Sequence, residues 1–124
     1  MPTADSASRL AAVKDRSTAR ITTRGRKTDR PHTVTIWFVV EGSTIYVATL
    51  NARRDWVRNL AKNPNVELEV DGINIRGRMH EITDGAIDAH VRTLLAAKYW
   101  AAWIGSFFGM GPEKTFRMDG REAT

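Results

Sequence analysis

The chain has 124 residues, 42% of them hydrophobic, which suits one compact domain with a core large enough to fold unaided. It contains no cysteine, so disulfides, thiolate metal sites and a cysteine nucleophile are excluded. The formal charge of +5 arises in residues 1–35, which hold eight Lys or Arg against three Asp, while the remainder is balanced.

Residues 1–17 predict a short helix or arm, capped by Asp5 or Ser6, with Leu10 and Val13 on its apolar side. They lack the basic start and apolar centre of a secretory signal. The longest apolar run, residues 99–110, is shorter than the ~20 residues that span a bilayer. We therefore expect a cytoplasmic protein.

Residues 18–23 and 33–41 predict two strands, and the second carries apolar residues on both alternating faces, so we expect both faces to be at least partly covered. Gly42-Ser43 has the composition of a hairpin turn and leads into a strand over 44–49. Asp55 is expected to begin a helix that continues to about Lys62 and stops before Pro64.

In the second half, residues 66–71 alternate apolar and acidic side chains, the pattern of a strand with one face in water. Gly72 turns the chain into a strand over 73–82. From Asp84 the spacing of Ile87, Val91 and Leu95 becomes helical. Residues 114–118 predict a last strand, followed by a frayed tail over 119–124.

These elements predict a mainly β fold with helices (α+β), in one domain spanning residues 1–124. About six antiparallel strands would form a small closed or split β-barrel with flanking helices. A parallel doubly wound sheet is disfavoured, because the middle of the chain consists of hairpins and does not alternate strand with helix.

Common catalytic motifs are missing. There is no Walker or dinucleotide-binding glycine pattern and no G-x-S-x-G elbow, and His32, His80 and His90 lack metal-ligand spacing, so we expect no metal. No recognition-helix pattern accompanies the basic region, so we expect no nucleic-acid partner. An enzyme without such groups can still work if a bound cofactor carries the reactive chemistry.

A cationic loop is the most informative feature of the sequence. Four cations crowd seven positions, and Gly25 and Pro31 shape the turn between them: Arg24, Arg26, Lys27 and Arg30. Several donors in one short loop suit a multiply charged anionic small molecule. The alternative is a solvated basic turn.

A second cationic pair, Arg53-Arg54, directly precedes the helix that begins at Asp55. Because helix N-termini favour anions, we expect the pair and the loop to converge on one anionic tail. Trp37, Tyr46 and Trp56 are candidates to wall a planar ring beside it, although the helical spacing of Trp56 also suits a core position.

The segments TTRGRKTDRPHTVTIWF (22–38) and RRDWVRNLAKNPNVELEV (53–70) together resemble the deazaflavin-dependent nitroreductase and quinone reductase family. That family shares its split β-barrel with the FMN-binding pyridoxamine phosphate oxidase group. The resemblance covers residues 21–82, with a weaker echo at Lys98-Tyr99. It implies binding of coenzyme F420, whose phosphate and glutamyl tail would meet the cationic loop.

Carried over position by position, the resemblance assigns cofactor binding to Gly25, Arg26, Lys27, Thr28, His32, Thr35, Ile36, Trp37, Trp56 and Asn59. The first four match the family's G-R-K-[ST] segment and would hold the tail, and Ile36 and Trp37 would face the ring. Members commonly have Arg where His32 stands and Pro where Thr35 stands. FMN binding therefore stays an alternative.

The resemblance implies an F420-dependent reductase that transfers hydride to a quinone, nitro compound or activated alkene. We expect Trp37, Tyr99, Trp100 and Trp103 to wall this small-molecule acceptor and Tyr99 to donate a proton. Core or dimer packing is the alternative for the 99–110 segment, so monomer and homodimer both stay open. A non-catalytic cofactor or lipid carrier, with that segment at a membrane surface, is a further alternative.

Overall fold

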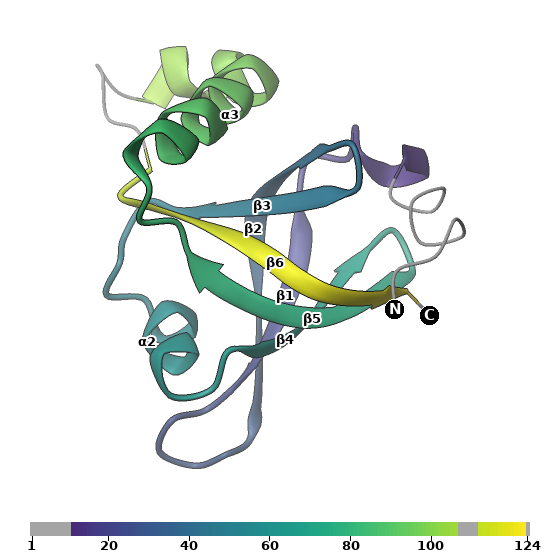
Figure 1. Ribbon diagram of the computed structural model, residues 1–124, viewed down its shortest axis with the longest axis vertical. Coiled ribbons are helices and arrows are strands. Elements are labelled where there is room, and N and C mark those ends of the chain that lie inside the picture. The colour runs from purple at the N-terminus through teal and green to yellow at the C-terminus, as the bar shows by residue number, and fades with distance from the viewer. Residues whose placement is uncertain (1–10, 107–111, 124) are drawn as a thin grey trace.

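The computed structural model describes residues 11–106 and 112–123, with the side chains of residues 100–106 and 120–123 excepted. Its centre is a closed barrel in which six antiparallel strands follow the order β1-β2-β3-β6-β5-β4 (Figure 1). The strands are β1 (Ala19–Arg24), β2 (Pro31–Glu41), β3 (Thr44–Thr49), β4 (Asn65–Val70), β5 (Ile73–Glu81) and β6 (Lys114–Ala123). The predicted fold class is confirmed.

Helix α2 (Asp55–Lys62) packs against β1 and β2, and helix α3 (Gly85–Ser106) packs against β2 and β6, so the two lie at different sides of the barrel (Figure 1). Helix α3 is kinked at Tyr99, where φ is −115° and ψ is 21°. Residues 11–13 are helical, whereas the expected cap at Asp5 or Ser6 lies outside the described residues. No helix in the described ranges is long and apolar enough to cross a membrane.

The last strand differs from its prediction. Residues 119–124 were expected to fray, but β6 continues to Ala123, which pairs with Ile75 of β5. A bulge between Arg76 and Arg78 allows this pairing, and Gly77 stands within it. A Cβ at Gly77 would lie 2.7 Å from the backbone oxygen of Asp119, so only glycine permits the close approach.

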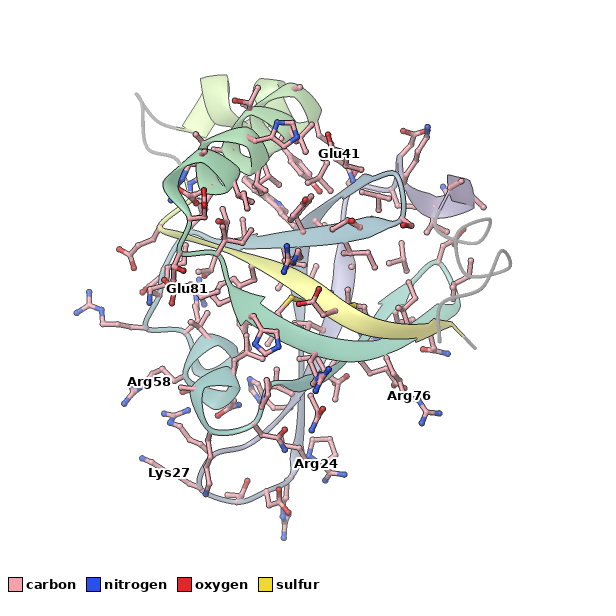
Figure 2. The ribbon with its side chains drawn as sticks, in the orientation of Figure 1. Arg24, Lys27, Glu41, Arg58, Arg76 and Glu81 are labelled. Atoms are coloured by element: carbon pink, nitrogen blue, oxygen red, sulfur yellow. The ribbon has the colours of Figure 1, made fainter. Side chains whose placement is uncertain are left out.

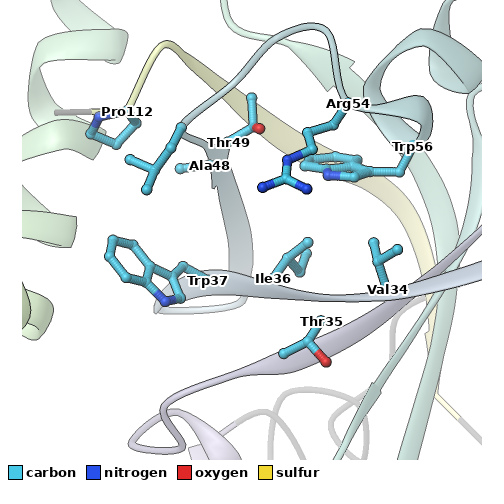
Figure 3. Close-up of a pocket in the computed structure, with 10 residues that line it drawn as sticks. Val34, Thr35, Ile36, Trp37, Ala48, Thr49, Arg54, Trp56 and Pro112 are labelled. Atoms are coloured by element: carbon cyan, nitrogen blue, oxygen red, sulfur yellow. The ribbon is translucent and has the colours of Figure 1, made fainter.

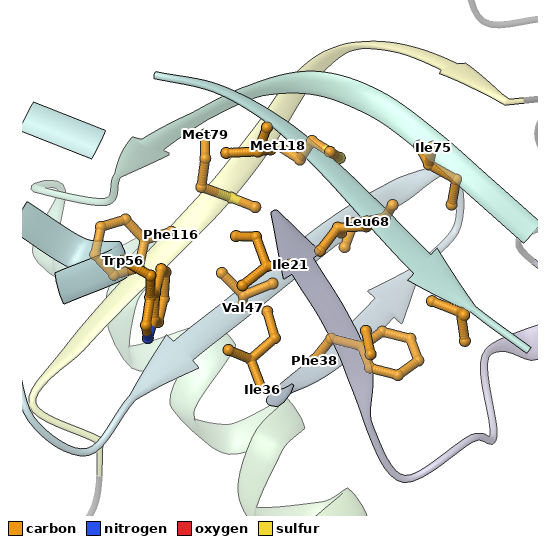
Figure 4. Close-up of a cluster of buried hydrophobic side chains, with 14 of the residues drawn as sticks. Ile21, Ile36, Phe38, Val47, Trp56, Leu68, Ile75, Met79, Phe116 and Met118 are labelled. Atoms are coloured by element: carbon orange, nitrogen blue, oxygen red, sulfur yellow. The ribbon is translucent and has the colours of Figure 1, made fainter. Parts of the chain in front are cut away.

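The barrel interior holds the larger of two apolar clusters. Alternate residues of the strands point inward, among them Ile21, Phe38, Val47, Leu68 and Met118 (Figure 4). Three residues of α2 join this cluster: Trp56, Val57 and Leu60. The amphipathic pattern of residues 55–62 therefore exists because α2 covers one end of the barrel, and each large side chain buried there contributes roughly 1.5–3 kcal/mol.

The smaller cluster lies outside the barrel, between α3 and the outer faces of β2 and β3. Val39, Tyr46 and Ala48 pack there against Val91 and Leu95. This second layer confirms the expectation that both faces of residues 33–41 are at least partly covered, since Val39 is buried on the outer face while Thr33 and Thr35 are exposed.

Candidate functional site

The cationic loop between β1 and β2 is a closed turn. Gly25 N–H donates to the backbone oxygen of Arg30 at 2.8 Å, and Asp29 N–H donates to that of Gly25 at 2.8 Å. Asp29 adopts a φ of 59°, and the guanidinium of Arg24 donates to its carbonyl at 3.0 Å. The loop therefore has a defined shape before any ligand arrives.

Loop and helix together enclose a basic pocket of about 300 Å³. Its lining combines the loop with two residues of α2: Gly25, Arg26, Lys27, Thr28, Arg30, Pro31, His32, Asp55 and Asn59. Lys27 extends from the tip of the loop toward solvent (Figure 2). The four residues expected to hold the cofactor tail, Gly25, Arg26, Lys27 and Thr28, thus share one pocket.

A second cavity, of about 230 Å³, lies between β2, β3 and the start of α2 (Figure 3). Its walls are largely apolar: Val34, Thr35, Ile36, Trp37, Ala48, Thr49, Leu50, Arg54, Trp56 and Pro112. Concave apolar cavities with a few polar groups are the usual form of small-molecule sites. We call the two cavities the basic pocket and the apolar pocket.

The two pockets adjoin, because the same two elements line both. Along β2, His32 lines the basic pocket and Val34 lines the apolar one, a separation of about 7 Å at two residues of extended chain. Along α2, Asp55 faces the basic pocket and its neighbours Arg54 and Trp56 face the apolar one. The two pockets therefore lie next to each other along β2 and the start of α2.

The two arginines before α2, Arg53 and Arg54, differ in whether they line a pocket. Figure 3 shows the Arg54 guanidinium directed into the apolar pocket. Arg53 lines neither pocket, and its backbone N–H donates to Oδ1 of Asn51 at 2.8 Å. Neither arginine lines the basic pocket with the loop, so the expected convergence of the pair and the loop on one anionic tail stays a prediction.

Two tryptophans form opposite parts of the apolar pocket wall. Trp56 is 4% exposed and tilts against Phe116 with ring centroids 5.5 Å apart, so it is both a core residue and a wall residue. Trp37 stacks on Tyr99 with centroids 4.8 Å apart and an interplanar angle of 9°. Tyr99 therefore supports the Trp37 wall from behind.

Tyr99, predicted to wall the acceptor, is not among the residues that line the apolar pocket. Its hydroxyl lies 2.7 Å from the carbonyl oxygens of Ser17 and of Phe38, and it accepts from Phe38 N–H at 3.1 Å. Burial raises the pKa of Tyr99 to about 12, although the hydrogen bond to the Phe38 backbone opposes this shift. A hydroxyl held by backbone groups in this way is poorly placed to donate a proton to a substrate.

This arrangement has a structural reason. The β1–β2 ladder begins with the pair Ala19 and Ile36. If the ladder continued by two more pairs, Ser17 would stand opposite Phe38. The Tyr99 hydroxyl lies between these two residues and satisfies backbone groups that the ladder leaves open. The side chains of Trp100 and Trp103, also expected at the acceptor site, lie outside the described part of the chain.

Five wall residues of the apolar pocket were not predicted: Val34, Ala48, Thr49, Leu50 and Pro112. Val34 alternates with Ile36 along one strand face, a signal that could have found it. No sequence signal indicated Pro112, because only the tertiary fold brings it to β3. Its neighbour Glu113 donates its backbone N–H to the Thr49 carbonyl there at 2.8 Å. Among the described residues, no three His, Asp or Glu side chains group as a metal site requires.

With fold and pockets in place, comparison with known proteins assigns the chain to a family. The sequence profile of the pyridoxamine 5'-phosphate oxidase family matches residues 8–123, and the chain belongs to this family. No curated protein matched the sequence significantly.

Solved structures share the fold at low identity. A candidate pyridoxamine 5'-phosphate oxidase from Listeria innocua is 15% identical, with a TM-score of 0.68 over 95% of this chain and 96% of that one. An FAD-binding protein from Mesorhizobium loti is 14% identical, with a TM-score of 0.68 over 98% and 93%. An F420-H2 dependent reductase, FDR-A, is 18% identical, with a TM-score of 0.65 over 84% and 95%. These likenesses establish the split-barrel fold.

Proposed function

We propose that this protein is an F420-dependent oxidoreductase that reduces a quinone, a nitro compound or an activated alkene, and that it works in the cytoplasm as a monomer or homodimer. The observation that carries the proposal is the adjacency of an apolar pocket walled by tryptophans and a basic pocket on one strand and one helix. A planar ring with a long anionic tail has the same two-part chemistry. The similarity of the fold to an F420-H2 dependent reductase supports the choice.

In the basic pocket, the exposed cations Lys27 and Arg30 would hold the anionic tail, with the Thr28 hydroxyl and His32 beside them. In the apolar pocket, Ile36 and Trp37 would orient the ring. The bound deazaflavin supplies the hydride chemistry. The chain binds the reacting partners and orients them.

The described lining of the apolar pocket contains no carboxylic acid, histidine, lysine or tyrosine. Its one ionisable group is Arg54, which does not give up its proton in proteins. We therefore assign the proton that accompanies hydride transfer to water, and we assign the Arg54 guanidinium to orienting an electron-rich group such as a quinone or nitro oxygen.

A flavin mononucleotide enzyme is the second candidate, favoured by membership of the pyridoxamine 5'-phosphate oxidase family. FMN offers one phosphate, whereas the F420 tail adds several carboxylates. The two exposed cations of the pocket, Lys27 and Arg30, are three residues apart along the loop, and this spread favours the longer tail.

Cofactor binding separates these candidates. Purified protein is titrated with F420, FMN, FAD and haem and read by absorbance and fluorescence, and reduced F420 is then offered menadione or a nitroaromatic acceptor. We expect F420 to bind with a lower Kd than FMN and its reduced form to be oxidised by the acceptor. Tight FMN binding without detectable F420 binding would establish the second candidate, and F420 binding without turnover would establish a carrier.

A further inference from the structure

Asn59 is a polar side chain in a buried position. It is 2% exposed, although it stands on the face of α2 that packs against the barrel. Its Oδ1 accepts both the backbone N–H and the Nη1 of Arg26, each at 3.0 Å, and its Nδ2 donates to the Thr23 hydroxyl at 3.1 Å. A buried amide is tolerated only when it is satisfied in this way, and here all its partners belong to β1 and the cationic loop.

Two more residues of α2 contact the same loop residue. Asp55 Oδ1 lies 3.2 Å from Nη2 of Arg26, and Lys62 Nζ donates to the Arg26 carbonyl at 2.8 Å. Positions 55, 59 and 62 are spaced by four and three residues, so they share one helix face. Helix α2 thus contacts the side chain and both backbone polar groups of Arg26.

These contacts divide the loop cations into two kinds. The Arg26 side chain is 20% exposed, and both of its terminal nitrogens already have partners on α2. Lys27 and Arg30 are exposed and line the same pocket. A largely buried cation that is held by an amide and a carboxylate contributes mainly position, whereas an exposed cation contributes attraction to an anion.

We propose that Asn59 is a positioning residue that pre-forms the anion-binding loop through Arg26, and that Arg26 is its partner and not a ligand of the anion. This inference rests on the proposed function for the identity of the anion, the phosphate and glutamyl tail of F420. Because the loop is held before binding, the ligand avoids the entropic cost of ordering it.

Hydrogen exchange in the absence of ligand tests the positioning role directly. In Asn59→Ala, the Arg26 amide should exchange at least tenfold faster than in the parent. Asn63→Ala is the matched control. Asn63 is the C-cap residue of the same helix, its Oδ1 accepts from the Asn65 backbone N–H, and it lines neither pocket. Unchanged exchange at Arg26 in Asn59→Ala would overturn the proposal.

Asn59→Asp provides a second test if Asn59→Ala does not fold. It keeps oxygen acceptors for Arg26, and its carboxylate can accept from the Thr23 hydroxyl. Its Arg26 amide should stay protected, while its F420 affinity should fall tenfold or more because a negative charge enters the pocket. That loss should shrink at high salt, unlike the loss in Asn59→Ala. Loss of amide protection in Asn59→Asp would contradict the positioning role.

The role of Arg26 is tested by the salt dependence of F420 affinity. Arg26→Gln should weaken binding about tenfold but reduce the salt dependence less than Lys27→Gln does, because the charge of Arg26 is partly compensated by Asp55. Lys27→Gln should weaken binding and reduce the salt dependence. Equal reductions in both variants would make Arg26 a ligand and overturn that half of the proposal. If the parent does not bind F420, the proposed function fails, and amide exchange still decides the role of Asn59.

Discussion

The two helices that flank the barrel use their polar side chains in opposite ways. On α2, Asp55, Asn59 and Lys62 hold a neighbouring loop so that its remaining cations face outward. On α3, Lys98 and Tyr99 bond to backbone oxygens of the barrel and the N-terminal segment. One helix builds a pocket, and the other completes the fold.

The difference shows that residue type alone does not mark a site. Lys98 donates to the carbonyls of Lys14 and Phe38 at 2.9 Å each and lies 3.8 Å from the centroid of the Phe38 ring. Lys27, in contrast, is exposed at the rim of the basic pocket. Availability of donors, and not the presence of a cation or a hydroxyl, separates the α2 side from the α3 side.

The largest expected effect is on the α3 side. Tyr99→Ala removes the stack on Trp37 and the hydroxyl at Phe38, so we expect a loss of roughly 3–5 kcal/mol in the free energy of unfolding. Tyr99→Phe keeps the ring and should lose about 1–3 kcal/mol. Urea denaturation measures both, and kcat of Tyr99→Phe should stay near that of the parent. A large fall in kcat at unchanged stability would return Tyr99 to the role of proton donor.

The next effect is on the α2 side. Lys27→Ala should weaken F420 binding by about 1.5–3 kcal/mol, the scale of a charge-assisted hydrogen bond, and leave the free energy of unfolding nearly unchanged. Lys14→Ala removes the same net charge outside both pockets and serves as the control. Fluorescence titration gives the affinities. Equal losses in the two variants would mean that only overall charge matters, and the contrast between the helices would no longer hold.

A smaller effect is expected from the one acidic residue that lines the basic pocket. Asp55→Asn removes a carboxylate 3.2 Å from Arg26, so an incoming anion meets less repulsion. Because Asp55 is exposed, we expect F420 to bind more tightly by about 0.3–1 kcal/mol at low ionic strength. The same titration with and without added salt measures this, and weaker binding in Asp55→Asn would show that the Arg26 contact outweighs the repulsion.

The smallest effect near neutral pH concerns the buried groups of α3. Burial lowers the pKa of Lys98 to about 8, partly opposed by Asp15. Above pH 8 the unfolded chain therefore binds a proton that the folded chain lacks, so stability should rise with pH. For Tyr99, whose pKa is raised to about 12, the folded chain keeps its proton above pH 10, and stability should fall there.

Denaturant midpoints measured from pH 7 to 11 should therefore pass through a maximum. Lys98→Met should remove the rise between pH 8 and 10, and Tyr99→Phe should remove the fall above pH 10. An unaltered rise in Lys98→Met would show that other groups produce it.

The elements were predictable where a local pattern sufficed. The hairpin at Gly42, where φ is 61°, and helix α2 agree with the sequence, because turn chemistry and helical spacing act over a few residues. The end of β6 was not predictable. It depends on a bulge at Gly77 that lies more than 40 residues away along the chain.

The candidate site was likewise predictable only in part. Clustering in sequence located the cationic loop, the nearby aromatic residues indicated Trp37 and Trp56 as ring-wall candidates, and the resemblance added Asn59. Neither the sequence clustering nor the resemblance showed that Asn59 hydrogen-bonds to Arg26, or that Pro112 lines the apolar pocket. Those contacts join segments more than 30 residues apart.

The sequence by itself determined the strand and helix pattern, the barrel class and the presence of a concentrated set of cations, because periodicity and turn chemistry are local. Only the tertiary structure decided which donors remain available. When the barrel closes, the buried amide of Asn59 and the hydroxyl of Tyr99 must find partners, since an unsatisfied buried polar group costs about 1–3 kcal/mol. The Tyr99 hydroxyl bonds to the backbone of Ser17, just before β1, and of Phe38 in β2, and the Asn59 amide bonds to Arg26. Lys27 remains exposed at the rim of the basic pocket.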